Sequence, residues 1–341
     1  MTKTTDWNQK LARFRKADWR RSVFELVLTA GALAGIWGLG WMAWSAGLWH
    51  VALVLTVPAA FFLVRMFMIQ HDCGHGAFFE QKAANEWVGR AIGVLTLTPY
   101  DYWRRTHAIH HATSGNLDRR GLGVIEMLTV DEYLALSPAK QLGYRLYRNP
   151  LVMFGLGPAF MFFIQQRIPV GLMKEGWRPW VSTLGNALGI LVATVVLVWL
   201  VGIVPILVVN AVTLLIAATI GVWLFFVQHQ FEGVAWARNS DWKREDAALH
   251  GSSHYDLPPV LRWLTANIGI HHVHHLSSRI PFYRLTDVLE AHPELKAVSR
   301  IGLMESFKCV RLALWDEAAQ RLVSFREVRG RTPTPISAAA A

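Results

Sequence analysis

The sequence contains few cysteines and few charged residues for its length. Only Cys73 and Cys309 occur among 341 residues, too few for a disulfide framework or an iron–sulfur cluster. Charged residues make up 17% of the chain, against roughly 25% in an average soluble protein, and 53% of the chain is hydrophobic. The first twenty residues have no apolar core, which predicts no cleaved signal peptide. This composition indicates a protein embedded in lipid.

The net charge of +10 comes without the motifs that accompany nucleic-acid binding. Neither a zinc-finger spacing nor an RNP-type motif occurs in the sequence. Sixteen Trp residues fit a membrane protein instead, because Trp collects at membrane–water interfaces and basic residues bind anionic headgroups. We therefore expect membrane lipid as a partner and no nucleic acid.

Four apolar stretches come close to or exceed the roughly 20 residues that cross the hydrocarbon core of a bilayer. They cover residues 23–48, 51–69, 181–201 and 205–227. The connections between the first two and between the last two are short, so we expect two helical hairpins. The sequence therefore predicts an all-α integral membrane protein with four transmembrane helices.

The 34 Lys and Arg residues avoid both hairpin turns. Seven lie in residues 1–22, twelve in 71–180 and fourteen in 228–341, while Arg65 lies within the second apolar stretch. By the positive-inside rule, both termini and the central loop are cytoplasmic, in a multi-pass protein of the cell (inner) membrane. We expect Arg65 to extend along its helix to the headgroups, with a role in the functional site as the alternative.

The two ends of the chain differ from the apolar centre. Residues 1–22 are predicted to form a cytoplasmic amphipathic segment, with Trp7, Leu11 and Phe14 on a face that rests on the membrane surface. Residues 329–341 are rich in Pro, Thr and Ala and are expected to be disordered.

Residues 23–328 are predicted to form a single membrane domain without a second soluble domain. Within it, residues 88–99 are apolar but too short to cross a bilayer, so we expect them to be interfacial or buried. Residues 151–164 are borderline in length. If they crossed, the basic loop after them would face outward against the charge rule, so we expect a re-entrant or interfacial segment.

The 14 histidines of the sequence are strongly clustered. The motif HDCGH begins at His71, HAIHH at His107 and HHVHH at His271. Histidines three or four residues apart share one helix face, so each motif can direct two or three imidazoles to one point. A further histidine, His229, ends the fourth apolar stretch. All four groups are predicted on the cytoplasmic side, where they can meet.

These histidines are too numerous for one metal ion. Zinc takes four ligands in a structural site and three plus water in a catalytic site. Eight or nine imidazoles therefore suit two ions of higher coordination number. Imidazole binds zinc, copper, iron and nickel alike, so the ligand type alone does not identify the metal.

Taken together, the three motifs resemble the histidine boxes of the membrane fatty acid desaturases. HDCGHGAF at 71–78 is similar to the first box of the delta-12/omega-6 type. THAIHHATSGNLDRR at 106–120 and NIGIHHVHHLSSRIPFY at 267–283 are similar to the second and third boxes. The resemblance covers about residues 71–283 and implies a bacterial acyl-lipid desaturase, which uses O2 to introduce a cis double bond into an acyl chain.

The resemblance also implies two iron ions, held in a cytoplasmic helical cap over the membrane helices. The ligands it implies are His71, His75, His107, His110, His111, His271, His274 and His275, with His229 in the place of a further ligand. Family members have an asparagine linked to the metal centre through water. No Asn lies beside His229, and Asn267 is the candidate for a comparable role. The chain has no fused cytochrome b5 or ferredoxin domain, so electrons are expected from a separate donor such as ferredoxin.

Several polar residues near the motifs are candidates for a supporting role. Carboxylates can orient a ligand histidine by accepting its second N–H, and plain surface or capping roles are the alternative. The carboxylate candidates are Asp72, Asp101, Asp118 and Glu232. His272, the remaining member of the third motif, is expected beside the metal ligands or toward solvent. The basic residues around the second motif are expected to face solvent, a lipid headgroup or an acidic electron donor; they are Arg104, Arg105, Arg119 and Arg120.

Three other functions fit parts of the pattern. A hydroxylase that acts on an alkyl or lipid substrate would use the same metal site. A membrane metal transporter would need ionisable residues along a path inside the helices, and the apolar stretches contain almost none. A bis-histidine haem protein would need facing histidines at mid-membrane. The sequence leaves the acyl position, the acyl carrier and the oligomeric state open.

Overall fold

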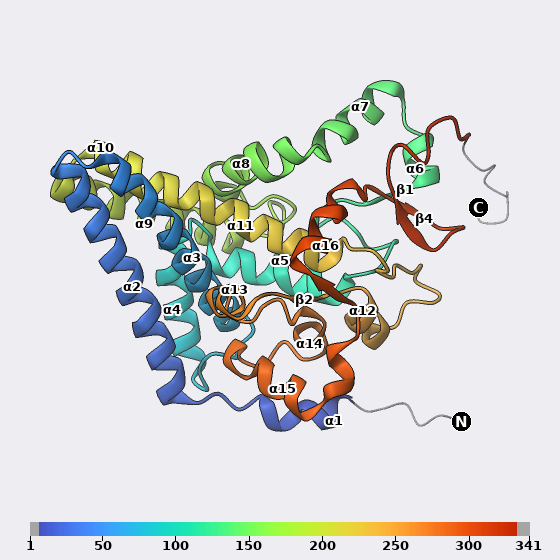
Figure 1. Cartoon of the computed structure of the whole chain (residues 1–341), viewed down its shortest axis with the longest axis horizontal. Coiled ribbons are helices and arrows are strands. Elements are labelled where there is room, and N and C mark those ends of the chain that lie inside the picture. The colour runs from blue at the N-terminus through green and yellow to red at the C-terminus, as the bar shows by residue number, and fades with distance from the viewer. Residues whose placement is uncertain (1–6, 333–341) are drawn as a thin grey trace.

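The computed structural model describes residues 7–332 and is mostly helical (Figure 1). Part of the segment expected to be amphipathic, residues 1–6, and most of the tail expected to be disordered, residues 333–341, lie outside the described residues.

Four long helical segments match the four predicted stretches, and each is long and apolar enough to cross a membrane. They are α2 (Trp19–Ser45), α3 (Trp49–Gly74), α9 (Arg178–Val201) and the run Ile203–His229, which comprises α10 (Ile203–Pro205), the π-helical η4 (Ile206–Ala211) and α11 (Val212–His229). Gly47 and Gly202 take positive φ angles of 77° and 85° at the two connections, a backbone conformation that glycine adopts without strain.

Both long helices that carry predicted ligand histidines extend beyond their apolar stretches. The sequence places the end of the second stretch at residue 69, but α3 continues to Gly74 and includes His71. Likewise, α11 continues to His229. Helical hydrogen bonding continues through polar residues at a helix end, so hydropathy marks where the lipid-facing part ends rather than where the helix ends.

The outer surface of α9 is apolar. Leu188, Leu191, Val195 and Trp199 are all exposed, and none of the most hydrophobic window of this helix is buried. An apolar surface of this size on a helix is typical of a lipid-facing segment. By contrast, α3 packs against α2, α4 and α11 and is the most buried of the four long segments.

Shorter elements form the rest of the molecule. They include the two apolar stretches that were not expected to span the bilayer: most of residues 88–99 lies in α4, and residues 151–164 lie mainly in η2 and α8. The helices are α4 (Lys82–Leu95), α5 (Tyr100–Thr113), α6 (Val130–Leu134), α7 (Pro138–Tyr147), the π-helical η2 (Val152–Leu156), α8 (Gly157–Phe163), α12 (Arg244–His250), α13 (Pro259–Leu264), α14 (His271–Leu276), α15 (Leu285–Ala291) and α16 (Leu303–Ser306). Two small sheets join distant segments: β1 (Leu128–Thr129), β4 (Leu314–Asp316) and β5 (Arg321–Val323) in the order β1-β4-β5, and β2 (His254–Asp256) parallel to β3 (Arg300–Gly302).

The N-terminal segment packs on the chain itself. Helix α1 (Trp7–Leu11) and the following turn bury Leu11 completely. The rings of Trp7 and Phe14 contact His292 edge-on, with centroids 5.6 and 6.3 Å apart. The amphipathic pattern is present, but its apolar face packs on protein, with Trp7 and Phe14 against the residue that follows α15 (Leu285–Ala291). The sequence pattern did not reveal this contact.

The expectation that Arg65 extends to the headgroups is wrong. Its side chain is buried and forms an ion pair of 2.5 Å with Glu25 of α2. It also donates a hydrogen bond to the carbonyl of Trp263 and lies over the rings of Trp263 and Phe282. A buried carboxylate within reach stabilises the guanidinium in place, so extension to water is unnecessary.

One continuous apolar core joins the membrane-crossing helices to the short elements beside them. It includes Ile69 of α3, Phe226 of α11, Val273 of α14 and Val288 of α15. The ends of α3 and α11 are therefore packed directly on α14. A smaller core under the three-stranded sheet contains Tyr133 and Tyr144 and does not reach the histidines.

Candidate metal centre

The first histidine pair lies at the end of α3. His71 is in the last helical turn, and His75 is the residue that caps the helix, with its N–H donating to the carbonyl of His71 at 3.2 Å. Because one helical turn separates them, both imidazoles point to the same side. Gly76 follows with φ of 64° and ends the helix, which keeps His75 at the helix terminus.

The second motif occupies the C-terminal half of α5. This helix begins after Pro99, and His107, His110 and His111 lie in its last two turns. Trp103 stacks on the ring of His107, with centroids 4.6 Å apart and planes at 15°. The backbone of Gly123 crosses the same helix so closely that an added Cβ would lie 2.8 Å from the carbonyl of Thr106. The helix is therefore fixed on two sides.

The third motif forms the short helix α14, which local helix propensity alone would not stabilise. Both His271 and His272 donate their backbone N–H groups to the carbonyl of Ser253 at 3.2 Å. A bridge between Ile270 and His254 further fixes the start of the helix. Tertiary contacts thus position this motif, which the sequence alone predicted only as a helical pattern.

His229, the C-terminal residue of α11, lies opposite α14. Its Nδ1 faces the carbonyl of Gly251 at 3.2 Å and the hydroxyl of Ser114 at 3.4 Å. An acceptor at Nδ1 favours the tautomer that leaves Nε2 unprotonated and free to bind a metal.

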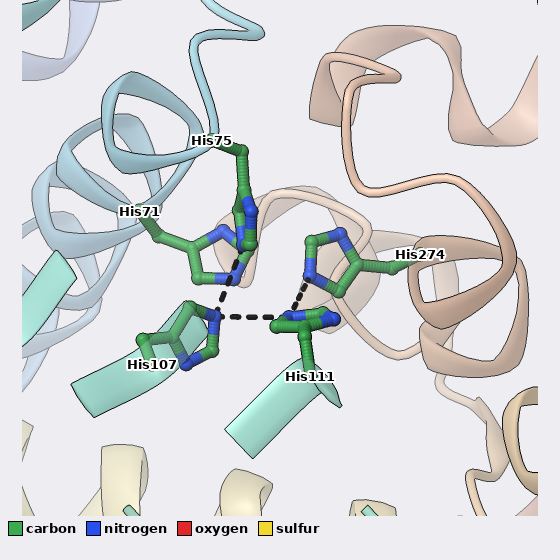
Figure 2. A group of neighbouring side chains, drawn as sticks. All are labelled: His71, His75, His107, His111 and His274. Atoms are coloured by element: carbon green, nitrogen blue, oxygen red, sulfur yellow. Dashed lines mark hydrogen bonds between the residues drawn. The ribbon is translucent and has the colours of Figure 1, made fainter. Parts of the chain in front are cut away.

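The structure brings all nine predicted ligand histidines together in two groups. Group A comprises His71, His75, His107, His111 and His274, shown in Figure 2. Group B comprises His110, His229, His271 and His275. Within each group the ligand-capable nitrogens lie within 4.8 Å of one another.

Each HxxHH motif contributes to both groups. In α5, His107 and His111 belong to group A and His110 to group B. In α14 the pattern is reversed, because His274 belongs to group A while its two partners belong to group B. Residues i and i+4 share a helix face and reach one group, while the residue at i+3 reaches the other group. The spacing therefore builds two adjacent sites from one helix.

The nitrogen–nitrogen distances fit metal coordination. In group A, the Nε2 atom of His107 lies 3.1 Å from that of His75 and 3.1 Å from that of His111, as the dashed lines in Figure 2 mark. In group B, the Nε2 atom of His229 lies 3.0 Å from those of His110 and His271. A neutral imidazole nitrogen carries either a hydrogen or a lone pair, so no tautomer gives all these contacts a good hydrogen bond.

The same distances favour a high coordination number. With metal–nitrogen bonds of about 2.1 Å, two ligands at 90° have nitrogens about 3.0 Å apart, and tetrahedral ligands have nitrogens about 3.4 Å apart. The observed separations of 3.0–3.1 Å match the right-angle arrangement. The five imidazoles of group A also exceed the four ligands of a closed zinc site.

Burial keeps the imidazoles in the form that binds metal. The side chains of His271, His274 and His110 are almost completely buried, while those of His75 and His107 are half-buried. Burial lowers the pKa of His107 and of His274 well below the ordinary value, and repulsion from the neighbouring imidazoles lowers it further. Both rings are therefore neutral at physiological pH.

Of the carboxylate candidates, Asp72 contacts a proposed ligand. Its Oδ1 lies 3.2 Å from Nδ1 of His71, and its Oδ2 accepts the backbone N–H of Phe282 at 2.6 Å. Asn267 does not contact a histidine through its side chain but donates to the carbonyl of the same Phe282 at 3.0 Å. Asp72 and Asn267 thus hold one loop residue from both sides.

Two other candidates lie away from both groups. Asp101 pairs with Arg90 at 2.9 Å and approaches Arg104 at 3.7 Å. His272 is buried rather than facing solvent, and its Nε2 lies 2.9 Å from the carbonyl of Leu295. Burial lowers the pKa of His272 to about 3, so its ring is a neutral hydrogen-bond donor in the core.

Most of the basic residues around the second motif are engaged in ion pairs. Arg105 pairs with Glu175, and Arg120 pairs with Glu132 at 2.5 Å. Asp118 pairs with Arg238 at 2.7 Å. These contacts join segments far apart in the sequence, which no local motif could have revealed. Ser253 and Gly251, which position the histidines, were also missed, because their roles arise only from tertiary packing. Trp103 was missed although it lies four residues before His107 on the same helix, a spacing that could have predicted the contact.

A small cavity adjoins group B. It is lined by Thr113, Ser114, Phe225 and Gln230 together with His110 and His229, among others, and its volume is about 20 Å³. This is room for about one water molecule and is too small for an acyl chain.

Comparison with known proteins agrees with this site. The fatty acid desaturase family model matches residues 47–301. A fatty acid desaturase from Bacillus subtilis (strain 168) is 43% identical over 323 residues, covering 94% of this chain and 90% of that protein. An sn-1 oleoyl-lipid 12-desaturase from Anabaena variabilis is 27% identical, covering 80% and 75%. An sn-1 acyl-lipid omega-3 desaturase (ferredoxin) from Synechocystis sp. is 26% identical, covering 80% and 74%. This chain belongs to the fatty acid desaturase family and is an oxidoreductase.

Proposed function

We propose that this protein is an O2-dependent acyl-lipid desaturase whose nine clustered histidines hold two iron ions. The observation that carries the proposal is the convergence of these histidines, from four separate segments, into two adjacent groups. Two iron ions would supply the oxidising power that an unactivated C–H bond requires and that amino-acid side chains lack.

The overall reaction balances with an external reductant. An acyl –CH2–CH2– unit loses two hydrogens to become –CH=CH–. Those two hydrogens, two further electrons and two further protons reduce one O2 to two molecules of water. The electrons come from a separate donor, for which the name of the Synechocystis relative supports a ferredoxin.

The chain's own residues orient the imidazoles and bury most of them. Three of the rings are fixed by one contact each: Trp103 stacks on His107, His71 donates to the carboxylate of Asp72, and His229 donates to the carbonyl of Gly251. Partners of this kind orient metal-binding histidines and raise their basicity. Most of the nine side chains are buried, which limits access of water to the reacting groups.

For the substrate, we propose the delta-12 position of a lipid-linked acyl chain. The similarity of HDCGHGAF at 71–78 to the delta-12/omega-6 box supports this position. The Anabaena relative is an oleoyl-lipid 12-desaturase and also supports it, whereas the Synechocystis relative acts at omega-3. Bond position is therefore the quantity that the assay must determine.

We further propose that the centre and both termini are cytoplasmic, in an inner-membrane protein with two helical hairpins and a cytoplasmic cap. The distribution of Lys and Arg supports this orientation, because both predicted turns contain none. His71 lies in the last turn of α3 and His229 is the last residue of α11, so the centre lies at one end of these long helices.

The test is fatty acid methyl ester profiling of a host that lacks polyunsaturated lipids, with and without this protein. We expect a new diene whose double bond reports the acyl position. The His107→Ala variant should abolish it, because His107 lies at the centre of group A. His250→Ala is the matched control, because His250 is exposed and belongs to neither group.

A hydroxylated acyl product would overturn the proposed reaction while leaving the metal centre intact. Absence of iron from the purified protein would overturn the centre itself. An omega-3 bond would keep the reaction and refute the delta-12 assignment.

A further inference from the structure

A surface hollow reaches the metal centre from the side of α1, α12 and α14. Its volume is about 390 Å³, far larger than that of the cavity beside His110. It is lined by Trp7, Asn8, Arg15, Arg244, Glu245, Ala248, His275, Leu276, Ser277, Ser278 and Arg279. We call this hollow the arginine groove, because three arginines and a single carboxylate lie along it.

One of the proposed metal ligands lines the arginine groove. His275 belongs to group B, and its Nε2 lies 3.1 Å from that of His271 in the same group. A molecule seated in the groove would therefore lie close to an imidazole of the centre. Electron transfer between proteins slows steeply with distance, so such an approach is what a protein electron donor requires.

The arginines of the groove are available to a partner. Arg244 and Arg279 are exposed, and within residues 7–332 their side chains have no hydrogen bond or ion pair. Arg15 is held in place by hydrogen bonds to Ser277 at 2.8 Å and Asn8 at 2.5 Å, neither of which neutralises its charge. This differs from Arg105 and Arg120 beside the second histidine motif, which are paired with carboxylates.

We propose that the arginine groove is the docking site for the electron donor, an acidic one-electron carrier protein. The inference rests on the proposed function, because a desaturase must receive two electrons per double bond. Two reduced carriers would dock in turn, each losing one electron and leaving oxidised. Three guanidinium groups against a single carboxylate leave the groove with excess positive charge, which fits a negatively charged surface, and such complementarity speeds encounter and fixes orientation.

The position of the groove favours a water-soluble partner over a lipid headgroup. In Figure 1, α1, α12 and α14 lie on the opposite side of the molecule from α10 and the start of α3. The short connections between the long apolar helices are at that far end. The groove thus lies beside the end of the helices that carries the histidines, where an aqueous carrier can reach it.

The experiment measures binding of a plant-type [2Fe–2S] ferredoxin of negative net charge to the iron-loaded, full-length protein in nanodiscs of neutral lipid. The variant is Arg244→Glu/Arg279→Glu. We expect its dissociation constant to rise about tenfold or more at low salt. At roughly 1 M salt, where the Debye length is about 3 Å, the wild type and variant should bind with the same weak affinity.

The matched control is Arg326→Glu/Arg329→Glu, because both arginines are exposed and follow β5 rather than lining the groove. It carries the same change in net charge and should bind ferredoxin as the wild type does. Iron content and thermal midpoint of both variants are measured first, so that a folding defect is recognised.

Equal ferredoxin affinity of the groove variant and the wild type would overturn the inference. In a separate preparation that contains phosphatidylglycerol, native mass spectrometry counts the bound lipid. Equal ferredoxin affinity together with loss of phosphatidylglycerol from the variant would assign the groove to a lipid headgroup. Failure of the proposed function would be visible separately, as a wild-type protein that forms no double bond with a small chemical reductant.

Discussion

The buried pair of Arg65 and Glu25 predicts an unequal loss of stability when either partner is replaced. Both side chains are almost completely buried, with exposed fractions of 2% and 1%. Glu25 has a second partner, Arg21, at 2.7 Å, whose side chain is half-exposed. Within residues 7–332, Arg65 contacts no second carboxylate, and its other contacts are with the carbonyl and ring of Trp263 and the ring of Phe282.

The magnitudes follow from which charge remains buried. Glu25→Gln leaves the guanidinium of Arg65 without a counter-charge, which costs about 3–5 kcal/mol of unfolding free energy. Arg65→Met leaves Glu25 paired with Arg21 and places an apolar side chain between two aromatic rings, so we expect a loss of about 1–2 kcal/mol. Replacing both residues with Met removes both charges and should come within about 1 kcal/mol of the wild type.

The assay is unfolding of the detergent-solubilised protein, followed by the thermal midpoint and by titration with a denaturing detergent. The control is Arg105→Met, because Arg105 and Glu175 are about half-exposed and such pairs contribute roughly 0–1 kcal/mol. Equal losses for Glu25→Gln and Arg105→Met would refute the reasoning. So would a double variant less stable than Glu25→Gln alone.

Two further predictions concern residues beside the histidines. Asp72→Asn removes the carboxylate that faces Nδ1 of His71, so iron affinity should fall about 10–100-fold, measured as iron retained during dialysis against a chelator. Asp101→Asn is its control, because Asp101 pairs with Arg90 instead, and equal iron loss in both variants would contradict the assignment. His272→Ala should keep its full iron content but lose about 2–3 kcal/mol of stability, since a buried ring bonded to Leu295 is removed. Loss of one iron from His272→Ala would instead make His272 a ligand.

The four long apolar segments could be predicted from the sequence, because the thickness of the bilayer sets a minimum length for each membrane-crossing helix. About 20 apolar residues are needed for each crossing, and that requirement leaves a continuous signal in the sequence. The end of α3 could not be predicted, because His71 continues the helix without continuing the hydropathy, whereas His229 was already placed at the end of the fourth stretch. Arg65 was misjudged for a related reason: its partner lies 40 residues earlier, on a different helix.

The sequence could predict that the nine histidines lie close together, but not which of them belong to group A and which to group B. Spacing of i, i+3 and i+4 shows that three imidazoles share a face. It does not show that His110 and His274 each join the group opposite to their neighbours, which depends on how α5 and α14 cross. The N-terminal segment is a similar case, because amphipathicity predicts an apolar face at Leu11 without showing what covers it.

The sharing of α5 and α14 between the two groups has a consequence for biosynthesis. His75 leaves the ribosome 200 residues before His275, a delay of about 10–40 s at roughly 5–20 residues per second. During that interval both groups lack the histidines of α14, so neither group is complete. The last motif completes both groups at once, so a metal ion that needs the full set of imidazoles can bind only after the C-terminal third has been synthesised.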